Sequence, residues 1–181
     1  MHQPSTVGDS ILVMCHPHPL YQGSMDNKVV TTVCRHFADQ GTPSFRFNYR
    51  GVGKSGGVYG DGIGESADAL SVVNYAKSLY PGKNLLLAGF SFGGFVAYQV
   101  SIPAQASSII LISPSVTHFD MKALPEPNVS LLVIQGDADE IVPHPEVAAW
   151  LATRKREYRF VTLAGAGHFF HGRLLELKEA L

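Results

Sequence analysis

The stretch Gly89-Phe90-Ser91-Phe92-Gly93 places one serine between two glycines, in the pattern G-x-S-x-G. This pattern is typical of a sharp turn between a strand and a helix, on which the serine hydroxyl is presented as a nucleophile. Glycines on either side of the serine let the strand and the helix approach each other closely. The spacing therefore predicts that Ser91 is a catalytic nucleophile.

The surroundings of Ser91 agree with this interpretation. The apolar run 85–88 before it predicts a strand buried on both faces, and the apolar segment 92–101 after it predicts a helix. The alternative interpretation is a glycine-rich turn with no chemical role.

A serine hydroxyl is a weak nucleophile and needs a histidine base that is oriented by a carboxylate. In strand-turn-helix sites of this kind, the acid and then the histidine follow the serine along the chain. We therefore predict that His168, in a glycine-rich loop, is the base, with His171 as an alternative that starts a helix. The residues alone leave three candidates for the acid, which are Asp137, Asp139 and Glu140. The remaining histidines are expected to be surface side chains or part of the first loop: His2, His36, His118 and His144 on the surface, and His16 and His18 in the loop.

The negative charge that forms during acyl transfer needs backbone donors. One expected donor is the amide of Phe92, at the N-terminus of the helix after the nucleophile. The second should come from the loop after the first strand. Pro17 and Pro19 in that loop have no N–H, so the amide of His18 is the preferred donor, and Leu20 and Tyr21 remain as alternatives. The loop could also pack against the sheet and donate nothing.

Two other kinds of site are disfavoured. His16 and His18 could bind a metal, but no third ligand has suitable spacing, so we expect no metal. The segment 51–56 matches G-x-G-x-x-G, and Gly53-Lys-Ser resembles the end of a phosphate-binding loop. Asn48 stands where that loop needs its first glycine, and the glycine-rich segment 56–62 cannot open a helix. We therefore expect no nucleotide and no cofactor.

The elements that must position these residues alternate between strand and helix patterns. Strands are predicted at 11–15, 44–48, 85–88, 108–112, 130–135 and 158–163, and helices at 26–40, 65–79, 92–101, 145–153 and 171–181. The segment 16–25 is too rich in proline and glycine for a helix or a strand. This order predicts an α/β fold, with a doubly wound, mainly parallel sheet of about six strands and helices on both faces. In such sheets the site lies at the carboxyl ends of the strands.

The composition limits the class of protein. The chain has 181 residues, which suggests a single domain over 1–181, and 45% of them are hydrophobic. The net charge of −1 does not indicate a protein that binds nucleic acid. No membrane span or secretory signal is seen, so a cytoplasmic location is expected. Cys15 and Cys34 fall in buried patterns and are expected to be free thiols.

With these residues identified, the chain resembles the α/β-hydrolase superfamily over nearly its whole length. More narrowly, it is similar to small, lidless bacterial serine hydrolases related to dienelactone hydrolases. The motifs that carry this resemblance are His-Pro-His-Pro-Leu-Tyr (16–21), Met-Asp-Asn-Lys-Val-Val (25–30), Phe-Asn-Tyr-Arg-Gly-Val-Gly-Lys-Ser (47–55) and Gly-Ala-Gly-His-Phe-Phe-His-Gly-Arg (165–173).

The resemblance also assigns roles. It selects Asp139 as the acid, matches His168 as the base, and matches His18 as the second oxyanion donor. The chain departs from dienelactone hydrolases in having Ser91 where they use cysteine, so their substrate does not carry over. The family usually begins with a β-hairpin before the strand at Ile11, but only ten residues precede that strand here. Either the chain starts late or the hairpin is missing, and a missing hairpin is the expectation.

The expected function is hydrolysis of a small carboxylic ester or thioester through an acyl-enzyme. An amidase or peptidase of the same fold and a non-catalytic binding scaffold are the alternatives. The connection 113–129 is too short for a lid of several helices, so an open site for small, soluble substrates is expected.

Overall fold

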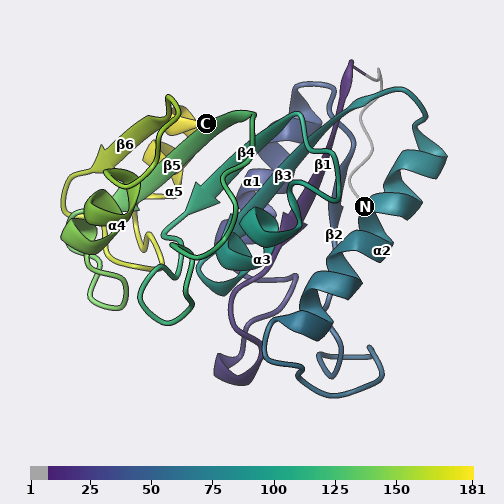
Figure 1. Ribbon diagram of the computed structural model, residues 1–181, viewed down its shortest axis with the longest axis horizontal. Coiled ribbons are helices and arrows are strands. Elements are labelled where there is room, and N and C mark those ends of the chain that lie inside the picture. Colours follow the sequence, from purple (N-terminus) through teal and green to yellow (C-terminus); the bar gives the residue numbers. More distant parts are fainter. Residues whose placement is uncertain (1–7) are drawn as a thin grey trace.

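The computed structural model describes residues 8–181, and its centre is a six-stranded sheet in the order β2-β1-β3-β4-β5-β6 (Figure 1). All neighbouring strands are parallel. The strands are β1 (Ser10–Cys15), β2 (Ser44–Arg46), β3 (Asn84–Phe90), β4 (Ser108–Ile112), β5 (Ser130–Gly136) and β6 (Arg159–Leu163). The prediction of a mainly parallel sheet of about six strands is confirmed.

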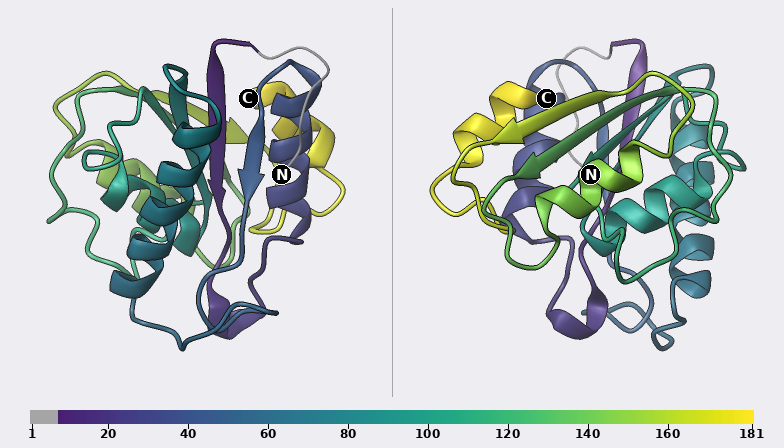
Figure 2. Two further views of the ribbon diagram at one scale, coloured as in Figure 1. Left: turned by 90° about the vertical axis from the view of Figure 1, so that its right-hand side faces the viewer. Right: turned by 60° about the vertical axis from the view of Figure 1, so that its left-hand side comes forward.

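Helices cover both faces of the sheet (Figure 2). One face carries α1 (Lys28–Asp39) and α5 (Leu174–Ala180), and the other carries α2 (Ile63–Leu79), α3 (Phe92–Val100) and α4 (His144–Leu151). Alternate residues of β3 point to opposite faces, so Leu87 belongs to the core under α2, α3 and α4, whereas Ala88 belongs to the core under α1 and α5. A strand buried on both faces needs the continuous apolar run seen before Ser91.

Three local expectations need correction. The segment 16–25 contains one turn of 3-10 helix, η1 (Pro19–Tyr21), because the His18 ring caps it by accepting a hydrogen bond from the Leu20 amide at 3.2 Å. The last helix begins at Leu174 rather than His171, since Phe170 and Gly172 have positive φ angles of 53° and 72°. β2 ends at Arg46, two residues earlier than expected.

The segment between β4 and β5 bears on access to the site. Within the described part of the chain, residues 113–129 form turns and irregular backbone without a helix, so the prediction that no helical lid follows β4 is confirmed. The expected absence of an N-terminal hairpin falls on residues 1–7, which lie outside the described residues. No helix within residues 8–181 is both long enough and apolar enough to cross a membrane.

Candidate active site

Ser91 lies between the end of β3 and the start of α3, at φ 55° and ψ −118°. A non-glycine residue with this backbone is strained, and the surrounding structure must hold it in place. The glycines of the motif allow this. A Cβ on Gly89 would lie 2.0 Å from the carbonyl oxygen of Gly93, and a Cβ on Gly93 would lie 2.3 Å from the carbonyl oxygen of Cys15. Only the hydrogen side chain of glycine fits at these two positions, so the elbow can form only with glycine at both.

His168 and Asp139 are joined in a buried pair. Nδ1 of His168 lies 2.9 Å from Oδ2 and 3.1 Å from Oδ1 of Asp139, and the two residues are 2% and 6% exposed. A neutral imidazole that donates from Nδ1 carries its lone pair on Nε2, which is the atom a general base needs. The His168 ring also packs on Phe90, the residue before Ser91, with ring centroids 5.0 Å apart.

The Asp139 carboxylate is held by donors from its own loop. Oδ1 accepts hydrogen bonds from the amides of Ile141 at 3.0 Å and Val142 at 2.8 Å. Burial disfavours the charged form of Asp139, but the hydrogen bonds from His168 and the Val142 amide outweigh this effect and lower its pKa. Asp139 is therefore ionised at neutral pH.

The two other candidate acids have different partners. Oδ1 of Asp137 accepts a hydrogen bond from the Gly165 amide at 2.6 Å, and Oε2 of Glu140 accepts one from the His168 amide at 3.3 Å. Both carboxylates thus contact the backbone of the loop that carries His168, and neither binds its ring. The alternative base, His171, lies exposed in the turn before α5.

Ser91 and His168 are linked through Phe90, which precedes Ser91 in the chain and packs on the His168 ring. Among residues 8–181, the structure shows no bond between Ser91 Oγ and the His168 ring, although both residues adjoin Phe90. Ser91 is 9% exposed, so a small part of its surface remains open to solvent. Hydrogen bonds between nucleophile and base are often long in the ligand-free state and shorten when substrate binds.

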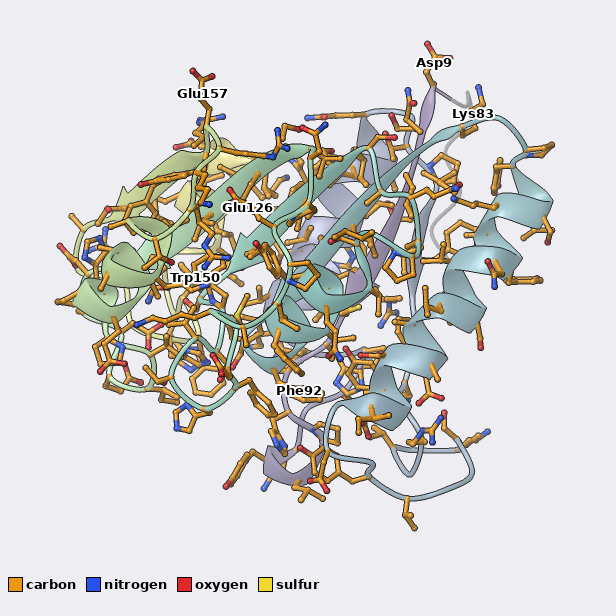
Figure 3. The ribbon with its side chains drawn as sticks, in the orientation of Figure 1. Asp9, Lys83, Phe92, Glu126, Trp150 and Glu157 are labelled. Atoms are coloured by element: carbon orange, nitrogen blue, oxygen red, sulfur yellow. The ribbon has the colours of Figure 1, made fainter. Side chains whose placement is uncertain are left out.

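The amides of Phe92 and His18 were the preferred oxyanion donors in the sequence, and the structure shows which loop amides have acceptors. Within the described residues, neither amide has a backbone or side-chain acceptor, whereas the two alternatives are engaged: the Leu20 amide donates to the His18 ring and the Tyr21 amide to the His18 carbonyl. The rings of His18 and Phe92 are in contact, with centroids 4.9 Å apart. Phe92 is labelled in Figure 3, between α3 and the η1 loop. Because Phe92 directly follows the nucleophile, this contact brings the η1 loop to Ser91.

His16 supports the fold of this loop. Its Nδ1 donates to the Pro17 carbonyl at 2.6 Å and its Nε2 accepts from the Tyr49 amide at 3.2 Å, so both ring nitrogens are used. Burial lowers the pKa of His16 to about 4, against the smaller opposing effect of the bond to Pro17. Among the residues that the structure describes, no three His, Cys, Asp or Glu side chains are grouped to hold a metal ion. Cys15 and Cys34 are buried free thiols, as expected.

Sequence reasoning missed two residues near the site. Gln135 is fully buried, and its Nε2 donates to Oδ2 of Asp139 at 2.9 Å and to the Val142 carbonyl at 2.8 Å. Gly23 closes the η1 loop, where a Cβ would lie 2.1 Å from the carbonyl oxygen of Pro17. A polar residue at the end of an apolar strand was the available signal for Gln135, and nothing in the sequence alone marks Gly23 as different from other loop glycines.

Comparison with known proteins places the chain among hydrolases. The family model described as "Serine aminopeptidase, S33" matches residues 27–126. An uncharacterized protein of Rickettsia prowazekii is 33% identical over 184 residues, which cover 94% of this chain and 76% of that protein.

Two solved structures have the same fold at higher identity. An α/β serine hydrolase homologue from Coxiella burnetii is 38% identical with a TM-score of 0.94, covering 98% of this chain and 86% of its own. An α/β serine hydrolase without a lid from Xanthomonas campestris is 37% identical with a TM-score of 0.93, covering 98% and 82%. From the family match, these relatives and the fold, the chain belongs to the α/β serine hydrolases, in the family described as serine aminopeptidase S33.

Proposed function

We propose that this protein hydrolyses a small carboxylic ester or thioester through an acyl-enzyme on Ser91. The observation that carries the proposal is the buried hydrogen bond between Asp139 and His168, with the imidazole packed against the residue that precedes Ser91. Burying a carboxylate and an imidazole costs free energy unless they are hydrogen-bonded to each other. Here the pair packs against the residue that precedes a strained serine.

In the proposed reaction, the same groups act first in forming the acyl-enzyme and then in hydrolysing it. His168 Nε2 takes the Ser91 hydroxyl proton as Oγ bonds to the substrate carbonyl carbon, and the amides of Phe92 and His18 stabilise the resulting oxyanion. The carbonyl re-forms as the bond to the leaving group breaks, and His168 gives its proton to the leaving oxygen or sulfur. Water then attacks the acyl-enzyme with the same proton transfers, which releases the acid and restores Ser91. Asp139 keeps the imidazole in the required tautomer.

A peptidase is the second candidate, favoured by the description of the matching family. The acyl-enzyme would form and be hydrolysed in the same way, with an amine as the leaving group. The non-catalytic scaffold is disfavoured, because a binding protein has no use for an ionised carboxylate buried against an imidazole beside a strained serine.

The test is labelling with a fluorophosphonate, followed by location of the adduct by peptide mass spectrometry. We expect one adduct on Ser91, none in Ser91→Ala, and normal labelling in Ser107→Ala, a matched change at an exposed serine. Matched p-nitrophenyl esters and p-nitroanilides of short acyl chains then separate the two enzymes. Faster turnover of the esters supports the proposal, faster turnover of the anilides supports the peptidase, and an unlabelled Ser91 contradicts both.

A further inference from the structure

Five aromatic rings meet beside the nucleophile, and we call them the aromatic wall: His18, Tyr21, Tyr59, Phe92 and Phe119. The His18 ring lies at the centre, with centroids 4.9 Å from each of Tyr21, Tyr59 and Phe92. Phe119 continues the wall, 5.1 Å from the Phe92 ring. The hydrolysis reaction described above does not use any of these side chains.

Four of the five rings of the aromatic wall, all except Tyr21, are held by packing or hydrogen bonds. Tyr59 and His18 are joined by a hydrogen bond of 3.1 Å between the phenol oxygen and Nε2. Phe119 is stacked on Phe95 with centroids 4.5 Å apart and an angle of 21° between the rings. Phe92 is buried as the floor, whereas His18, Tyr59 and Phe119 are half-buried and Tyr21 is 82% exposed. The wall therefore offers ring faces that need no rearrangement to receive a ligand.

The aromatic wall and His168 lie on opposite sides of Ser91. Phe92, Tyr59 and Phe119 pack with the core under α2, α3 and α4. The His168 ring packs instead on Phe90, which belongs to the core under α1 and α5. No ring contact joins His168 to the wall within the described residues.

This arrangement determines where each part of a substrate lies. The leaving-group atom must be within reach of His168, which protonates it, and the carbonyl oxygen must point to the amides of Phe92 and His18. The remaining substituent of the carbonyl carbon, the acyl group, is then directed away from His168 and onto the aromatic wall. Phe119 also lines a cavity of about 650 Å³ between the loop 116–122 and α4.

We infer that the preferred acyl group carries an aromatic ring, so that the substrates are esters or thioesters of aryl-substituted carboxylic acids. The inference rests on the proposed function. Planar rings gain from offset or edge-to-face contact with other rings beyond the gain from buried area. A long alkyl chain gains no such contact and loses more conformational freedom when it is fixed on an open surface.

The experiment compares ethyl 3-phenylpropanoate with ethyl 3-cyclohexylpropanoate, which have the same leaving group and the same acyl carbon skeleton. We expect kcat/KM to be about 2- to 12-fold higher for the phenyl ester. In Phe119→Leu and in Tyr59→Leu the ratio should fall toward one. The matched control Tyr158→Leu alters a tyrosine that is 38% exposed, just before β6, and should keep the wild-type ratio. The ratio is measured within one preparation, so a partly unfolded variant does not distort it.

Equal rates for the two esters in the wild-type protein would overturn the inference, as would an unchanged ratio in both Phe119→Leu and Tyr59→Leu. Ethyl acetate, which has no group to reach the aromatic wall, separates this result from failure of the proposed function. Hydrolysis of ethyl acetate with equal rates for the two larger esters contradicts the aromatic preference alone. No hydrolysis of any ester, together with an unlabelled Ser91, contradicts the proposed function and this inference with it.

Discussion

Asp139 lies 2.9 Å from Nδ1 of His168, whereas Asp137, two residues earlier, binds the Gly165 amide instead. The two carboxylates extend from the same loop, and the tight turn between them turns only the second toward the imidazole. Their neighbouring positions offer a matched pair for testing which one acts in the reaction.

Asp139→Asn should lower kcat for a p-nitrophenyl ester by about 10⁴-fold, because an amide donor at this position favours the wrong imidazole tautomer. Asp137→Asn should change kcat by less than about twofold, since its amide oxygen can still accept from Gly165. Steady-state kinetics of the two variants check the prediction. A large loss in Asp137→Asn with a small loss in Asp139→Asn would assign the acid to Asp137.

The elbow predicts a stability effect at a single glycine. Gly89→Ala should destabilise the fold by about 3 kcal/mol, the upper end of the usual cost of overpacking, because the added Cβ meets backbone that cannot move without displacing α3. Gly56→Ala is the matched control, since a Cβ there has no neighbour within 4 Å. Urea unfolding of both variants is the measurement. Equal stability of the two variants would mean that the strand and helix are not packed as closely as described.

His16 predicts a pH dependence of stability. Its pKa is lowered to about 4 in the folded protein from 6.5, so the unfolded chain binds a proton more readily between these values. The contribution of neutral His16 to the free energy of unfolding should therefore be fully present above pH 6.5. It should decline as the pH falls, by about 3 kcal/mol at pH 4. His16→Gln should lack this component, so its stability gap to the wild type should narrow on acidification. Urea melts at several pH values check this, and a constant gap would contradict it.

The absence of a helical lid predicts simple kinetics at high substrate concentration. Nothing in residues 113–129 of the described chain forms a helix that could cover Ser91 and be released at an interface. The rate of p-nitrophenyl butyrate hydrolysis should follow a hyperbola through the solubility limit. A lipase with a lid, assayed in parallel, should show a jump at that limit. A similar jump in this protein would contradict an open site.

The sequence predicted the parallel sheet and the sharp turn between β3 and α3 at Ser91, because apolar runs and the pattern G-x-S-x-G depend on local geometry. The residue types alone did not decide which of Asp137, Asp139 and Glu140 pairs with His168, because that choice depends on how one turn orients its side chains. Gln135 was missed because its hydrogen bonds depend on the path of the chain as far as Val142. The aromatic wall also lay beyond sequence reasoning, because its rings come from three loops and the first residue of α3, and Tyr21 and Phe119 are 98 positions apart.

The central claim is that Ser91 and His168 act as one catalytic unit, and a double-mutant cycle tests it most directly. Ser91→Ala and His168→Ala should each lower kcat by about 10⁶-fold, and the double variant should be within about tenfold of either single variant. This result is expected because a nucleophile without its base, or a base without its nucleophile, performs no step of the reaction. If the loss in the double variant equals the product of the two single losses, Ser91 and His168 act independently and the proposed mechanism is wrong.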